Sequence, residues 1–177
     1  MLKYHNFYRA RHNAPRMSLD SSLNAAAQSY AEKLASQGTL VHSSNGDGEN
    51  LGIQCGSQPI SQTTDWYVLE LIKWSINSCP RFIVQKIYAN IYSEFLLHIR
   101  YNENKYYDYY NGVSTTGDDI GHFTQVVWKG SSRLGVGKAR GWAYIQGQWW
   151  DNCDFIVARY SPAGNVKGRY QSNVQRP

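Results

Sequence analysis

The chain has 177 residues, of which 42% are hydrophobic and 18% charged, and its formal net charge is +5. This composition is typical of one globular domain with its own core, and it excludes a low-complexity or disordered chain. The positive residues are dispersed and accompany no recognised nucleic-acid module, so we expect weak attraction to anionic membrane surfaces rather than nucleic-acid binding.

Two helices are predicted near the N-terminus. The first spans about 2–12 and ends before Pro15, because a residue that precedes proline avoids the helical region. The second starts after a cap formed by Asp20 or Ser21 and ends at Gly38. Its apolar side chains recur at the spacing of one buried helix face: Leu23, Ala27, Tyr30 and Leu34.

A glycine- and serine-rich loop at 43–48 separates His42 from Glu49. Glycines at 46 and 48 let the backbone fold back there, so that the two flanking side chains can meet.

Further along, the opening turns of a third helix are predicted at 61–67. Three short alternating segments, 134–139, 142–146 and 155–160, are typical of antiparallel strands joined by hairpins. Helices on both sides of such strands predict one α+β domain.

Four motifs point to a family. In chain order they are residues 5–12, 48–51, 121–131 (Gly-His-Phe-Thr-Gln-Val-Val-Trp-Lys-Gly-Ser) and 155–165. Together they closely resemble the signatures of the CAP superfamily, which includes cysteine-rich secretory proteins, antigen five and plant pathogenesis-related proteins. Two stretches resemble its Golgi-associated group most: 134–139 and 158–160. The resemblance implies an α+β fold, a three-layer α-β-α sandwich with a central antiparallel sheet, as a single domain over 1–177.

The segment 68–101 interrupts the superfamily's Trp-Tyr-x-Glu sequence, which begins at 66–67 and resumes at 102–103. Because a tyrosine stands at both edges, the boundary can be drawn one residue either way. Three interpretations stay open: an intron translated in frame, a lineage-specific insertion that covers the sheet or forms a partner surface, and a membrane-lying helix over 82–100. The helix rests on an apolar stripe: Val84, Tyr88, Ile91, Phe95 and Ile99.

The resemblance also implies a cluster of two histidines and two glutamates at the base of a cleft. Carried over by motif, these are His42, Glu49, Glu103 and His122. An alignment without a gap at the insertion would put Leu69 in the place of Glu103, with Glu70 one residue out of register. Two imidazoles with carboxylate suit Zn²⁺, with His42 and His122 as metal ligands and the second carboxylate as a further ligand or an orienting group. The alternative is a hydrogen-bonded acid–base cluster without metal.

Aromatic residues gather in the predicted hairpin at Trp142, Tyr144 and Trp149. Superfamily members that bind sterol use an aromatic loop between their last strands, so these residues are candidates for lipid contact. The alternative is that they form cross-strand packing pairs.

The three cysteines, Cys55, Cys79 and Cys153, are odd in number and widely spaced, so they define no disulfide framework and favour a reducing compartment. A Cys55–Cys153 pair is left open. No signal peptide is evident, and Leu2 excludes myristoylation. We expect a location in the cytoplasm or peripheral to membranes, and an extracellular one if the N-terminus is incomplete.

These observations predict a non-enzymatic binding module for lipid, sterol or a partner protein, with a divalent metal tuning its cleft. The alternative is a metal-dependent hydrolase that uses His42, His122 and a carboxylate around a bound water. Homodimerisation is a third hypothesis.

Overall fold

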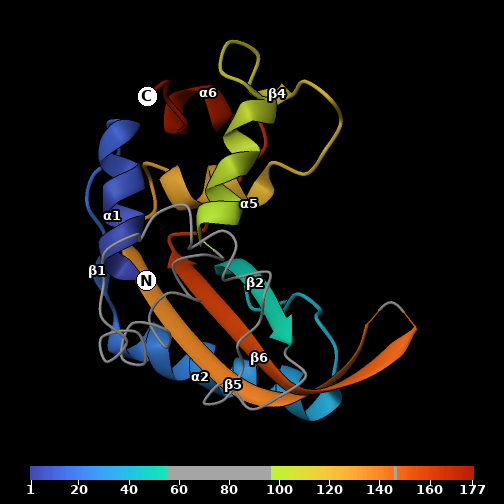
Figure 1. Ribbon diagram of the computed structural model, residues 1–177. Coiled ribbons are helices and arrows are strands. Elements are labelled where there is room, and N and C mark those ends of the chain that lie inside the picture. The colour runs from blue at the N-terminus through green and yellow to red at the C-terminus, as the bar shows by residue number, and fades with distance from the viewer. Residues whose placement is uncertain (56–96, 146) are drawn as a thin grey trace, which may run out of the picture.

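The computed structural model describes residues 1–55, 97–145 and 147–177 (Figure 1). Its larger sheet has the strand order β1-β5-β6-β2. The strands are β1 (Ser18–Leu19), β5 (Arg133–Ile145), β6 (Gln148–Ser161) and β2 (Gly48–Cys55). The long neighbours β2, β6 and β5 are antiparallel as predicted, whereas the two-residue β1 pairs parallel to β5. The fold is therefore α+β with a mixed sheet.

Helix α2 (Ser21–Gln37) covers one face of this sheet. Asp20 caps it by accepting a hydrogen bond from the Leu23 amide at 3.0 Å, and Gly38 ends it in the left-handed conformation at φ 64°. Both predicted boundaries are confirmed. Glycines on β5 let the helix approach closely: a Cβ on Gly137 would lie 2.3 Å from the Ala27 carbonyl.

A second layer packs against the other face at one end of the sheet, where Met1 and Leu2 contact the cluster that contains Leu134, Ala158 and Tyr160. It contains α1 (Leu2–Arg11), α5 (Gly121–Val127), the 3-10 helix η1 (Asn102–Tyr106), the short hairpin of β3 (Tyr107–Asp108) and β4 (Val113–Ser114), and α6 (Tyr170–Asn173). In Figure 1, α2 runs behind the sheet, and α1, α5 and α6 lie above its upper end. Along β6, Phe155 and Val157 join the α2 core while Ala158 and Tyr160 join a cluster with Met17, as alternation along a strand requires.

Two polar residues of α1 tie it to neighbouring backbone. The Asn6 amide donates to the Met17 carbonyl and its oxygen accepts from the Met17 amide. The buried Arg9 guanidinium donates to four carbonyls, those of Pro15, Val126, Trp128 and Ser131. These bonds help to satisfy the backbone polar groups that pack around the helix.

The hairpin differs from its prediction. The segments expected as two strands, 134–139 and 142–146, form the single strand β5, with a register shift between Gly141 and Ala143. Such an irregularity lets one strand continue through a bend. The predicted end at residue 146 lies outside the described residues.

The predicted third-helix opening at 61–67 and positions 68–96 of the interrupting segment lie outside the described residues. Its last five residues, 97–101, are helical and join the core beside α1: Leu97 and Tyr101 are buried, and the Tyr101 ring stacks on Tyr8 at 3.9 Å. Ile99, the one described member of the predicted apolar stripe, is exposed. The other four members of the stripe lie outside the described residues, so the stripe stays a prediction.

Cys55 and Cys153 form a disulfide that joins the last residue of β2 to β6. This is the pair that the cysteine count leaves open, and it contradicts the expectation of reduced thiols for these two residues. The two cysteines are 98 positions apart, so only the strand register brings them together. Cys79 lies outside the described residues. Among the helices that the structure describes, none has the length and hydropathy needed to cross a bilayer.

Candidate functional site

The first half of the predicted cluster is a pair formed by His42 and Glu49. His42 Nδ1 lies 2.9 Å from Glu49 Oε1, and the carboxylate also accepts from the Ser43 amide at 3.0 Å and the Ser43 hydroxyl at 2.8 Å. Arg159 Nη2 lies 3.7 Å from the other carboxylate oxygen. The Glu49 side chain is 5% exposed and that of His42 is 61% exposed. Glu49 is therefore a buried anchor that holds an outward histidine.

The loop before β2 makes this pair in the predicted way. Gly46 adopts φ 84°, a conformation that favours glycine. Gly48 is packed so closely that a Cβ would lie 2.3 Å from Gln125 Oε1. Asp47 accepts a hydrogen bond from Arg159 at 3.3 Å. The same guanidinium therefore contacts Asp47, within the turn, and Glu49, which follows it.

The second half is a pair formed by His122, on α5, and Glu103, on η1. Glu103 Oε1 lies 2.8 Å from His122 Nδ1, and Glu103 Oε2 accepts from the Phe123 amide at 3.0 Å. The carboxylate thus satisfies a free amide at the start of α5 while it orients the imidazole. Among the described residues, Glu103 is thus the glutamate beside His122, and Leu69 lies outside them.

Residues next to His122 hold its helix in place. Thr124 Oγ1 donates to Asn165 Oδ1 at 2.6 Å, and Gln125 Oε1 accepts from the Gly164 amide at 2.9 Å. The side-chain amide of Asn50, on β2, donates to the His122 carbonyl at 3.2 Å. Since Asn50 follows Glu49 directly on β2, this bond links the two halves.

Each carboxylate can only accept, so each histidine donates its Nδ1 proton and keeps Nε2 available for a ligand. The two halves remain separate pairs. Within 1–55, 97–145 and 147–177, a single set of three His, Cys, Asp or Glu residues has its ligand atoms within 4.8 Å of one another: Glu103, Asp119 and His122. The four predicted residues do not form one such set.

Two residues beside His122 were not predicted. Asp119 Oδ2 lies 3.6 Å from His122 Nδ1. Arg100 Nη1 lies 3.4 Å from the same nitrogen and 3.9 Å from Glu103 Oε1, while its Nη2 donates to the Leu51 carbonyl at 2.9 Å. The signal in the sequence is spacing alone, since Asp119 precedes His122 by three residues and Arg100 precedes Glu103 by three.

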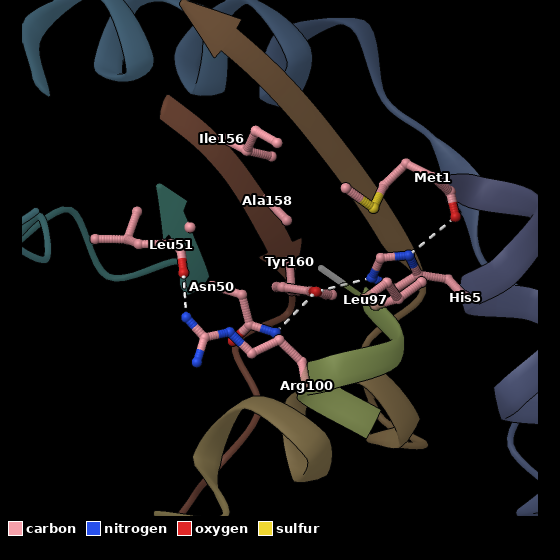
Figure 2. Close-up of a pocket in the computed structure, with 10 residues that line it drawn as sticks. Met1, His5, Asn50, Leu51, Leu97, Arg100, Ile156, Ala158 and Tyr160 are labelled. Atoms are coloured by element: carbon pink, nitrogen blue, oxygen red, sulfur yellow. Dashed lines mark hydrogen bonds between the residues drawn. The ribbon is translucent and has the colours of Figure 1, made fainter. Parts of the chain in front are cut away.

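A cavity of about 30 Å³ lies beside this half, between the sheet and the helical turn that carries Arg100. Figure 2 shows Leu51, Ile156 and Ala158 on one side of it and the Arg100 side chain reaching toward Leu51. This volume suits one or two water molecules, which excludes a lipid inside the cavity among the described residues.

A chain of buried hydrogen bonds borders the cavity (Figure 2). The Asn50 amide donates to the Tyr160 hydroxyl at 3.1 Å, and that hydroxyl lies 2.8 Å from His5 Nε2. Burial lowers the pKa of His5 to about 4 and raises the pKa of Tyr160. Both side chains are therefore neutral at pH 7: His5 Nδ1 donates to the Met1 carbonyl, and His5 Nε2 accepts from the tyrosine.

The aromatic hairpin forms an exposed cluster at the far end of β5 and β6. Trp142, Tyr144 and Trp149 are 46%, 57% and 64% exposed. Tyr144 is the cross-strand partner of Trp149, and the Trp149 ring lies 5.0 Å from each of the other two. Trp142 also packs over the α2 cap, where a Cβ on Gly38 would lie 2.6 Å from its ring. The three rings thus pair across the strands and still present apolar surface to solvent. We call them the aromatic tip.

Comparison with known proteins assigns the family. The model of the cysteine-rich secretory protein family, CAP, matches residues 2–157. The human Golgi-associated plant pathogenesis-related protein 1 is 34% identical over 180 residues, covering 100% of this chain and 91% of its own length. Pathogenesis-related leaf protein 4 of Solanum lycopersicum is 32% identical, covering 94% of this chain and 78% of its own length.

Among solved structures, NaASP2 with Zn²⁺ matches with a TM-score of 0.54 and 18% identity, over 99% of this chain and 84% of that one. At this identity the likeness supports the fold alone, and it agrees with the predicted sandwich. The family match and the human relative also support the prediction of a non-enzymatic domain of this type. The chain therefore belongs to the cysteine-rich secretory protein (CAP) family.

Proposed function

We propose that this chain is a non-enzymatic CAP-domain protein that works at the periphery of a membrane, where it contacts lipid, including sterol, through the aromatic tip. The observation that carries the proposal is the exposure of three adjacent aromatic rings, Trp142, Tyr144 and Trp149. Tryptophan and tyrosine favour the boundary between lipid headgroups and acyl chains, because one end of each ring system is apolar and the other is polar.

Two further features support a surface contact over an enclosed lipid. The cavity beside Arg100, at about 30 Å³, is too small for a sterol or an acyl chain. The formal net charge of +5 adds attraction to anionic headgroups.

Co-sedimentation with vesicles tests this proposal. We expect stronger binding to vesicles with phosphatidylserine than to neutral ones, and Trp149→Ser should weaken binding about tenfold, because a partly inserted indole contributes on the order of 1–2 kcal/mol. Phe7→Ser is the matched control, since Phe7 is a 51% exposed aromatic on α1. Equal, negligible binding to both kinds of vesicle, or equal loss in both variants, would contradict the proposal.

The second part of the proposal is a divalent cation, Zn²⁺ first, for which His42 and His122 each offer Nε2 as a ligand in their own half of the cluster. The residues fit it in one respect: each imidazole donates Nδ1–H to a carboxylate, the arrangement that orients histidine ligands and raises their basicity. Imidazole nitrogen with carboxylate oxygen is also a donor set that zinc prefers. The bound cation would change the affinity of the cleft for its ligand.

The grouping of Glu103, Asp119 and His122 favours metal-dependent hydrolysis as a second candidate function. A bound divalent ion would supply a Lewis acid and acidify a water there. The chain's own residues would orient the imidazole through Glu103 and take up a proton at a carboxylate oxygen. Loss of hydrolysis in His122→Ala, with metal retained in the parent, is the expected result. Unchanged hydrolysis in that variant would refute this candidate.

Self-association is a third proposal, and the aromatic tip would be its surface. Light scattering separates it from lipid contact: a dimer that Trp149→Ser converts to a monomer assigns the tip to a second copy of the chain. A monomer in both forms leaves the tip free for lipid.

A further inference from the structure

Arg100 lies beside His122 and Glu103, the pair to which a divalent cation would bind in the second half of the cleft. Its Nη1 lies 3.4 Å from His122 Nδ1 and 3.9 Å from Glu103 Oε1. His122 Nδ1 already donates to Glu103, so it cannot also accept from Arg100. The contact between Arg100 and this pair is therefore one of charge, with the guanidinium against the carboxylate that orients the imidazole.

Arg100 is also held in this position. Its Nη2 donates to the Leu51 carbonyl on β2 at 2.9 Å. The residues on either side along its helical turn, Leu97 and Tyr101, are both buried in the core beside α1. The backbone at Arg100 is thus fixed, and the side chain is tied to the sheet at its far end (Figure 2).

The first half of the cleft also has a guanidinium, that of Arg159, but it contacts carboxylates and not the imidazole. Arg159 binds Asp47 and Glu49 from the buried side, and these two carboxylates balance its charge. Arg100, by contrast, lies against the imidazole itself and shares one carboxylate, Glu103, with it.

We propose that Arg100 is a built-in cation that competes with a divalent metal at His122 and so sets the metal affinity of the cleft. The inference rests on the metal part of the proposed function. An arginine stays protonated at every physiological pH, so a metal on either ring nitrogen of His122 would meet a fixed like charge. To bind, the metal must displace the guanidinium or bear its repulsion.

Zinc titration by calorimetry tests this on the purified full chain, with Arg100→Gln, Arg100→Lys and the parent side by side. We expect Arg100→Gln to bind Zn²⁺ on the order of tenfold more tightly than the parent, because one unit charge close to the site is removed. Arg100→Lys keeps the charge and should stay near the parent. Arg11→Gln, an exposed arginine on α1, changes the net charge equally and should have no effect.

A second variant locates the effect. His122→Ala added to Arg100→Gln should abolish the gain, and the NMR signals of the His122 ring should shift on zinc addition in Arg100→Gln. Equal, tight binding by the parent and Arg100→Gln would overturn the competition while leaving the metal part of the proposed function in place. No binding by either would overturn both.

Discussion

The two halves of the cleft use the same chemical unit, a histidine bonded to a glutamate, in opposite ways. In the first, the carboxylate of Glu49 is buried under Arg159 and the histidine projects outward, with His42 61% exposed. In the second, both partners are mostly covered, and His122 lies between Glu103, Asp119 and Arg100. The first half therefore resembles a structural ion pair that displays a histidine, whereas the second resembles a charged pocket around one.

Breaking the buried ion pair should have the largest effect. Arg159→Ala leaves Glu49 and Asp47 without their cation, and we expect the free energy of unfolding to fall by about 3–5 kcal/mol, as for other buried pairs that lose one partner. Urea unfolding followed by circular dichroism measures it. Arg133→Ala removes an exposed pair with Asp20 and should cost about 1 kcal/mol or less. Similar losses in both variants would show that the Glu49 side is no more dependent on its ion pair than the surface is.

The hydrogen-bonded chain of Asn50, Tyr160 and His5 should make the free energy of unfolding depend on pH. Burial lowers the pKa of His5 to about 4 from an ordinary 6.5, so the unfolded chain binds more protons between these values. The stability contributed by neutral His5 is complete above pH 6.5 and is lost as pH falls toward 4, by about 3 kcal/mol in total. Burial lowers the pKa of His12 in the same direction, which adds to the loss.

Urea midpoints between pH 7.5 and 4 measure this dependence. His5→Gln should reduce the slope of stability against pH across that window, whatever its own stability at pH 7. An unchanged slope would mean that His5 does not titrate with folding.

The smallest effect should come from the histidines themselves, and it should differ between the halves. His42→Ala should cost about 0.5 kcal/mol, because its partner bond is half in solvent. His122→Ala should cost about 1–2 kcal/mol, because it leaves a mostly covered carboxylate short of a donor. Thermal unfolding of both variants at pH 7.5 makes the comparison; equal losses would remove the distinction drawn between the two halves.

Much of the secondary structure could be predicted, because the sequence patterns that specify it are local. A periodic apolar face with Asp20 or Ser21 at its start and Gly38 at its end predicts α2 to within one residue, and the glycines at 46 and 48 predict the turn that joins His42 to Glu49. The motif at 121–131, through its resemblance to the CAP signature, identifies His122 as a site residue. Each of these depends on backbone conformation over a few neighbouring residues.

Other features were missed or left open because they depend on which distant segments meet. Arg100 reaches His122 only because Leu97 and Tyr101 bury the turn that carries it, and Cys55 meets Cys153 only through the register of β2 against β6. The expected strands at 134–139 and 142–146 merge because β6 pairs with both.

The amino-acid sequence by itself determined the helix α2 and the turn that lets His42 meet Glu49, since side-chain type and short-range backbone preference suffice for these. The family and the choice of Glu103 and His122 came from the resemblance of its motifs to the CAP superfamily. The tertiary structure alone decided that the pairs stay separate, that a guanidinium attends each, and that the aromatic tip faces solvent. Those outcomes follow from long-range packing and strand register, which bring together groups that no local pattern relates.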